Sequence, residues 1–289
     1  MLLASILLDG LVTGCLYALV AVGFSLLWWL TGIIHIAHGA VYLVAGYAMF
    51  ALGVSAGLPF LLAMAGAIVT AVVAGAAVQL VIYRPFQRRA ATEDAIITAS
   101  LGILIIVQYV VVILFGPEGV SVDVGLRKPL LADGPRVLDR FSVIAILSAV
   151  AATIGLHFLL RRTNLGKAMR AAAENDYLAE VLGLPIRRIQ IIAHALAAAM
   201  VVPAAILFLC DTGVHPPEAL HLVLMAAVVA ILGGKGSVVG ALVGGVAVGI
   251  AESGMVFILD AGWRQLITFS LLYVLLLVRP QGLFGTKAA

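Results

Sequence analysis

Charged residues are scarce in this chain. Asp, Glu, Lys and Arg together make up 11% of its 289 residues, while hydrophobic residues make up 64%. Soluble globular domains carry roughly 25% charged residues. A water-soluble fold cannot hide so much apolar surface, so the composition excludes a soluble globular domain and indicates a protein of the lipid bilayer.

Cysteines and clustered basic residues are also few. The two cysteines, Cys15 and Cys210, show neither the spacing of a metal site nor that of a disulfide framework. The formal net charge is only +3 and the basic residues are dispersed, whereas a nucleic-acid-binding surface needs a concentrated basic patch. We therefore expect no metal site and no nucleic-acid partner.

The chain lacks the motifs of nucleotide binding and of catalysis. Its glycine-rich run 233–237 contains a Gly-Lys pair, but a P-loop also needs an earlier glycine where this chain has Val229. His35 and His38 are too close together for a metalloprotease helix, and no glutamate follows His35. No Ser/His/Asp or Cys/His group can be recognised. We expect no catalytic residue and no cofactor in this chain, and hence no enzyme.

Apolar stretches, by contrast, recur along the whole chain. A bilayer core about 30 Å thick needs roughly 20 apolar residues per helical span. Two of the stretches, 40–54 and 222–232, are short enough alone to be broken or re-entrant helices. The pattern predicts an all-α integral membrane protein, a polytopic bundle of about eight to nine transmembrane helices in a single domain over 1–289. The nine stretches are 11–30, 40–54, 59–83, 95–115, 141–160, 189–209, 222–232, 238–259 and 266–278.

Lysine and arginine predict the orientation of this bundle, because positively charged loops stay on the cytoplasmic side. The loops after the third and fifth stretches stand out by their basic residues, and the mixed-charge segment 116–140 lies between them. We therefore expect both basic loops inside and 116–140 outside. Counting outward puts the N-terminus outside and the C-terminus inside. The basic loop residues are Arg84, Arg88, Arg89, Arg161, Arg162, Lys167, Arg170, Arg187 and Arg188.

Four ionisable residues lie in or directly beside the apolar stretches: His38, His157, His194 and Glu252. Such groups are costly in a membrane, so they usually face the protein interior or a water-filled path. A hydrogen-bonded contact between helices is the alternative for each, and it is favoured for His157 and His194. For His38 and Glu252, contact with the solute and a hydrogen bond between helices are about equally favoured.

Small residues recur at helical spacing, notably over 240–249. Glycine and alanine allow helix backbones to approach closely in a membrane. This spacing predicts a tightly packed bundle.

The loop 161–188 contains a second helical pattern. Asp176 can cap a short helix, Leu178, Val181 and Leu182 repeat at helical spacing, and Gly183 suits a left-handed end. Pro185 prevents continuation. The pattern predicts a compact amphipathic helix, which either lies on the membrane surface or docks a partner protein.

Six segments show a characteristic order and spacing: 9–23, 34–39, 84–86, 163–183, 233–252 and 278–285. Together they resemble the permeases of branched-chain, or hydrophobic, amino-acid ABC importers. The resemblance runs nearly from end to end. Two positions depart from the family pattern, with His35 where asparagine is usual and Met225 where lysine is frequent.

The resemblance implies a membrane-spanning permease subunit that moves solute by alternating access in a bacterial or archaeal cytoplasmic membrane. Its implied partners are a second permease chain, two cytoplasmic ATPases that bind ATP and Mg, and an extracytoplasmic solute-binding protein. The helix in loop 161–188 would then be the coupling helix that meets the ATPase. The expected coupling residues are Arg170, Glu174, Asp176, Leu178, Val181, Leu182 and Gly183.

Two alternatives remain at this point. The solute of such a permease can be urea, an amide or an aromatic acid in place of a branched-chain amino acid. A secondary transporter or channel for a small polar solute is the rival class, and it would need no ATPase. Secondary transporters and channels usually carry ionisable residues in several spans, which couple or guide solute movement. The spans of this chain contain few ionisable residues.

Overall fold

The computed structural model describes residues 2–127, 139–258, 261–279 and 281–285. These residues form helices with no strand among them, apart from a single bridge between Val120 and Val214. The α-helices are α1 Leu2–Thr31, α2 His38–Phe50, α3 Phe60–Ala77, α4 Arg84–Arg88, α5 Glu93–Phe115, α6 Arg140–Arg162, α7 Asn164–Glu174, α8 Asp176–Val181, α9 Ile186–Asp211, α10 Ala219–Gly233, α11 Val238–Ile258 and α12 Arg264–Val278. The π-helical turns Ala51–Ser55 and Val78–Tyr83 extend α2 and α3, and 3-10 turns at Pro216–Glu218 and Ala261–Trp263 precede α10 and α12.

Eight helical segments among the described residues are long and apolar enough to cross a membrane, and the apolar part of α12 is shorter. This confirms the predicted all-α polytopic bundle. Both doubtful stretches belong to continuous helical segments of 18 residues, His38–Ser55 and Pro216–Gly233. The 3-10 turn and the first residues of α10 lengthen 222–232, whereas 40–54 gains only His38, Gly39 and Ser55.

Helix α1 forms the centre of the bundle. It packs against α6, α9, α10 and α11, and most of its apolar stretch is buried. Helices α3, α5 and α6 bury only 28%, 22% and 28% of their apolar stretches inside the protein. Since a membrane protein solvates its outer apolar surface with lipid, these three helices form the lipid-facing periphery.

Glycines set the contact between α1 and α11. A Cβ atom added at Gly14 would lie 2.6 Å from the carbonyl oxygen of Gly245, and one added at Gly10 would lie 2.7 Å from the Cα of Ile250. Only hydrogen fits between backbones at this distance. The tight packing predicted from the small residues of 240–249 is thus confirmed at this interface.

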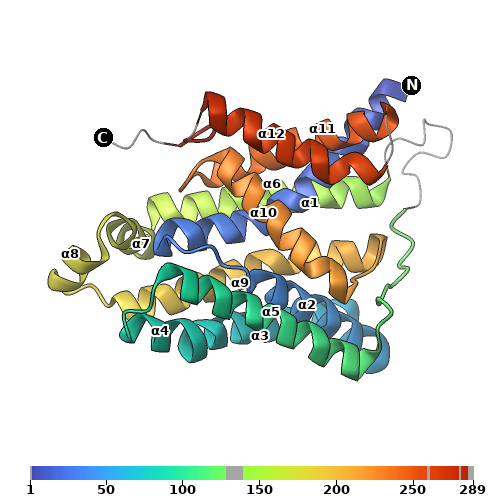
Figure 1. The fold of residues 1–289 in the computed structure, drawn as a ribbon. Coiled ribbons are helices and arrows are strands. Elements are labelled where there is room, and N and C mark those ends of the chain that lie inside the picture. The colour runs from blue at the N-terminus through green and yellow to red at the C-terminus, as the bar shows by residue number, and fades with distance from the viewer. Residues whose placement is uncertain (1, 128–138, 259–260, 280, 286–289) are drawn as a thin grey trace.

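The two ends of the bundle differ in what they carry. The N-terminus and the segment around Val120 lie at one end, while α4, α7 and α8 lie at the other (Figure 1). The backbone N–H groups of Leu283 and Phe284 donate to the carbonyls of Leu232 and Gly233, where α10 ends. The basic loops and residues 281–285 therefore share one end.

Candidate solute path and coupling surface

The connection between α1 and α2 turns back into the bundle. The ring nitrogen Nε2 of His38, the first residue of α2, lies 3.3 Å from the carbonyl oxygen of Val20. About 16 Å of helix separates Val20 from Thr31, the last residue of α1. Segment 32–37 therefore runs back beside α1, and α2 begins well inside the protein (Figure 1). Backbone at this depth is tolerated where protein buries it.

A cluster of buried polar side chains surrounds this start of α2. The Tyr83 hydroxyl shares a short hydrogen bond with Nδ1 of His35 and donates another to Ser100 Oγ, 3.0 Å away. Ser100 Oγ also accepts from the Ala37 N–H at 2.7 Å. The His35 ring lies 5.2 Å from that of His194 and 5.8 Å from that of His38, centroid to centroid. We call His35, His38, Tyr83, Ser100 and His194 the histidine cluster.

The histidine cluster is buried in the protein interior, and each of its five side chains is at most 3% exposed. Neutral imidazole and hydroxyl groups can donate to and accept from a polar solute without a buried charge.

The predicted residues are only partly brought together. His38 lies in the histidine cluster, and so does His194, for which a packing contact was favoured. The sequence analysis did not predict His35, Tyr83 and Ser100 as site residues. These positions are far apart in the sequence, and no helical or strand spacing relates them. Glu252 lies in a separate polar group, where its carboxylate accepts hydrogen bonds from Tyr17 of α1 and Thr268 of α12.

A polar cavity of about 480 Å³ opens at the end of the bundle that carries α8. Gln79 is buried there, and its Nε2 donates to Oε1 of Gln190 at 3.1 Å. Oε1 of Gln79 has no hydrogen-bond partner among the described residues. The backbone carbonyl of Gln190 in turn bonds Nδ1 of His194 at 2.8 Å. Asp176 and Glu180 of α8 also line the cavity, which thus lies between the histidine cluster and α8.

Helix α8 presents an apolar surface that nothing in the chain covers among the described residues. Tyr177, Leu178, Val181 and Leu182 are 76%, 53%, 66% and 75% exposed, and Ala179 is the buried anchor on the opposite side. We call these four exposed side chains the α8 surface. The predicted amphipathic helix is confirmed, with its apolar side chains pointing away from the bundle.

The ends of α8 confirm one prediction and correct another. Gly183 has φ +89°, the left-handed conformation that ends a helix. The predicted cap at Asp176 is wrong. Asn175 caps α8, and its Oδ1 accepts from the Leu178 N–H at 2.8 Å. Asn175 has the extended backbone of a capping residue, whereas Asp176 is already the first helical residue.

The rest of the predicted coupling loop forms α7, a helix that was not predicted separately. Thr163 caps it by accepting from the Gly166 N–H at 3.0 Å. The guanidinium of Arg170 donates to the carbonyl of Leu160 at the end of α6, so part of Arg170 fixes α7 to the bundle. Glu174 is exposed at the last position of α7.

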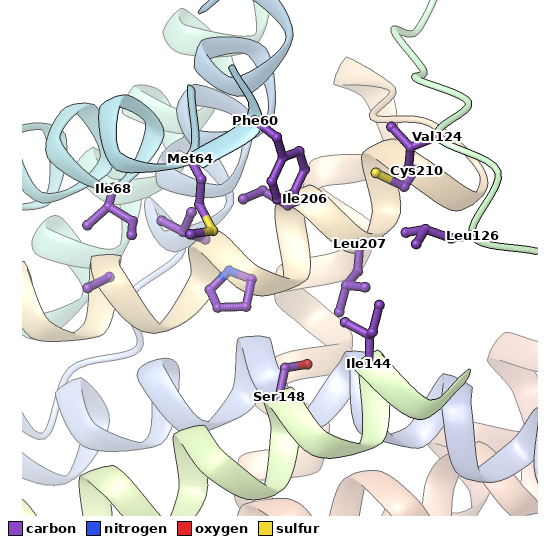
Figure 2. A pocket seen from close by; sticks show the side chains of 13 residues that line it. Phe60, Met64, Ile68, Val124, Leu126, Ile144, Ser148, Ile206, Leu207 and Cys210 are labelled. Carbon is purple, nitrogen blue, oxygen red and sulfur yellow. The ribbon is translucent and has the colours of Figure 1, made fainter. Parts of the chain in front are cut away.

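Another cavity, about 630 Å³ in volume, is an apolar groove between α3, α6 and α9 (Figure 2). Phe60, Met64 and Ile206 point into it, with Ser148 on the α6 side. Apolar side chains suit acyl chains, and this groove offers a polar solute few hydrogen-bond partners. Among the described residues, no group of three or more His, Cys, Asp or Glu side chains is arranged to hold a metal ion.

Comparison with known proteins gives the family. Residues 6–278 match the family described as branched-chain amino acid transport system / permease component. The high-affinity branched-chain amino acid transport system permease protein LivH of Escherichia coli K12 is 33% identical, over 96% of this chain and 94% of the relative. BraD of Pseudomonas aeruginosa, a permease protein of the same description, is 28% identical over the same shares. LivM of Escherichia coli K12 is 26% identical over 93% of this chain and 67% of the relative. The chain therefore belongs to the permease component family of branched-chain amino acid transport systems.

Proposed function

We propose that this chain is the membrane-spanning permease subunit of an ATP-driven importer for branched-chain amino acids or related hydrophobic solutes. The observation that carries the proposal is the exposed α8 surface, which lies beyond the polar cavity at the end of the bundle with the basic loops. A permease without its own nucleotide site must receive ATP-driven movement through a physical contact. An apolar surface on a short, capped helix suits such a contact.

The same end of the bundle would face the cytoplasm. Support comes from the basic residues that α4, α6, α7 and α9 place there, because positively charged loops stay inside. The C-terminus would then be cytoplasmic and the N-terminus would lie outside. The host would be a bacterial or archaeal cytoplasmic membrane.

The assembly would contain two permease chains, two cytoplasmic ATPases that hold ATP and Mg, and an extracytoplasmic solute-binding protein. The similarity of this chain to both LivH and LivM supports a second, related permease chain as its partner. Import would proceed by alternating access.

The solute path would pass polar features within apolar surroundings. An amino-acid zwitterion needs partners for both of its charges, whereas its side chain needs only apolar contacts. His38, with the histidine cluster around it, and Glu252 are the proposed polar features. Support for His38 comes from its position at the start of α2 inside the bundle.

Coupling would work through two faces of α8. Leu178, Val181 and Leu182 would fill an apolar groove on the ATPase, with Glu174 at its charged rim. Asp176 lines the polar cavity, so displacement of α8 would change that cavity directly. Arg170 would keep α7 attached to α6, and Gly183 would let the chain turn toward α9.

The test is a single charge in the α8 surface. Leu182→Asp would bury an unpaired carboxylate at the contact, at a cost of several kcal/mol, so solute-stimulated ATP hydrolysis and ATPase retention should both fall sharply in the reconstituted complex. Val124→Asp is the matched control, an exposed apolar side chain outside α8, in the segment before α6. It should retain the ATPase.

Two outcomes would contradict the proposal. Normal stimulation and normal ATPase retention in Leu182→Asp would remove α8 from the coupling role and leave a helix on the membrane surface. Uptake of urea or an amide by this chain alone in liposomes, without ATP, would support the secondary transporter or channel.

A further inference from the structure

A second polar cavity, about 460 Å³ in volume, lies at the same end of the bundle as α8 but on another side. It is formed by the ends of α1 and α6, by α7, by the turn before α11 and by Phe284. Arg161, Arg170 and Lys235 line it, with His157 beside them. We call this cavity the basic pocket.

The basic pocket differs from the cavity beside α8 in its charge. Carboxylates of Glu93, Asp176 and Glu180 line the cavity beside α8 together with arginines, whereas no carboxylate lines the basic pocket among the described residues. Two of the three cations that line the basic pocket have neutral partners. Arg170 donates to a backbone carbonyl, and Nζ of Lys235 lies 5.9 Å from the Trp28 ring centroid. Uncompensated positive charge is therefore concentrated at one place.

The turn that carries Lys235 is held in position. Gly236 has φ +82°, and a Cβ atom added there would lie 2.7 Å from Cδ1 of Trp29. The side chain of Ser237 accepts from the Gly240 N–H at 2.9 Å and so caps α11. The first N–H groups of α11 add a partial positive charge beside the lysine.

Apolar surface continues from the basic pocket toward the middle of the bundle. Ile154 and Phe158 of α6 precede Arg161 at helical spacing and are 62% and 61% exposed. Val239 and Val243 are exposed at i, i+4 spacing on α11, which packs against α6. A ligand with an anionic head and an apolar tail matches this order of surfaces.

We propose that the basic pocket binds the phosphate of an anionic phospholipid, with an acyl chain along the exposed side chains of α6 and α11. Basic pockets between helices at the cytoplasmic side attract such headgroups, since each lysine or arginine near the surface contributes electrostatic attraction. A phospholipid is favoured over a soluble phosphate as the source of the bound phosphate group, because the pocket continues onto the lipid-facing surface. The proposed function enters this inference at one point only, because it assigns the basic pocket to the cytoplasmic leaflet.

The experiment measures lipid binding by the full chain, delipidated in neutral detergent, with phosphatidylglycerol as the probe and native mass spectrometry as the readout. Arg161→Gln/Lys235→Gln should weaken phosphatidylglycerol binding by about tenfold and leave phosphatidylcholine binding unchanged. Lys167→Gln/Arg188→Gln removes the same charge from exposed residues that do not line the pocket, and it should bind phosphatidylglycerol as the wild type does.

Three outcomes would overturn the inference. Equal weakening in both double variants would mean diffuse attraction without a site. Inorganic phosphate that competes at equal concentration would mean a site for a soluble anion. Unchanged phosphatidylglycerol binding in Arg161→Gln/Lys235→Gln would mean that the basic pocket does not hold the lipid.

Misfolding can be told apart from loss of the site. If the double variant aggregates, the single variant Lys235→Gln, a change at an exposed turn, should still show weaker phosphatidylglycerol binding. The readout uses no ATPase and no transported solute, so failure of the lipid site and failure of the importer assignment are distinguishable.

Discussion

The phenol oxygen of Tyr17 on α1 lies 3.1 Å from Oε2 of Glu252 on α11 and donates a hydrogen bond to it. The other carboxylate oxygen accepts from Thr268 on α12. One buried side chain thus joins three helices. Whatever its part in the solute path, Glu252 holds the C-terminal helices to the centre of the bundle.

Removal of this carboxylate should loosen the bundle. Glu252→Ala leaves two buried hydroxyl groups without their acceptor, so we expect the free energy of unfolding to fall by about 1–3 kcal/mol. Glu252→Gln keeps an acceptor oxygen and should lose less. Thermal denaturation in detergent measures the difference, with Glu118→Ala, an exposed carboxylate, as the control. Wild-type stability of Glu252→Ala would show that the two hydroxyl groups find other partners.

Gly14 should not tolerate a methyl group. In Gly14→Ala the new Cβ meets the backbone of Gly245 and Val246 at 2.6 Å, and backbone cannot move aside cheaply. We expect a loss of roughly 1–3 kcal/mol from overpacking. Gly102→Ala in α5 is the matched control, because nothing lies within 4 Å of its added Cβ. If both variants melt at the same temperature, α1 and α11 are not held by close backbone contact.

Asp139 should make stability depend on pH in acid. Burial alone would raise the pKa of its carboxyl, but hydrogen bonds from Ser142 and the charge of Arg127 outweigh burial and lower it below the ordinary 3.8. A lowered folded-state pKa gives stability that is present above pH 3.8 and is lost as the pH falls through the folded value. Wild type should therefore exceed Asp139→Asn in stability at neutral pH.

The two proteins should converge below pH 3.8, where Asp139 is protonated in the unfolded chain. Asparagine keeps the oxygen that caps α6, so this comparison isolates the charge. Asp139→Ala also loses the cap and should cost about 1 kcal/mol at every pH. A wild-type advantage that persists unchanged at pH 3 would contradict the assigned pKa direction. Urea titrations in detergent across this pH range give the values.

His38→Ala should impair transport more than assembly. The imidazole is a polar group where α2 begins inside the bundle, and loss of one such hydrogen-bonding partner should slow solute uptake by about tenfold. The assembled complex should still retain its ATPase. His157→Ala on α6 is the control histidine outside the cluster. If His38→Ala and Glu252→Gln both leave uptake rate and solute preference unchanged, neither residue belongs to the solute path.

Much of the fold follows from the sequence by itself. Apolar length predicts the number of membrane-crossing helices to within one, because each crossing must satisfy its own backbone hydrogen bonds within the bilayer. Local spacing also predicts the apolar side chains of α8 and the left-handed end at Gly183. The repeated glycines of 240–249 predict close packing, although not the partner helix, which is α1.

Tertiary structure alone decides which residues meet. His35 and Tyr83 share a hydrogen bond although 48 residues separate them, and Tyr17 meets Glu252 across 235 residues. No local period encodes such distances, since helix packing sets them. The cap of α8 is decided in the same way. Asn175 and Asp176 are both good capping residues, and only the backbone conformation after α7 selects Asn175.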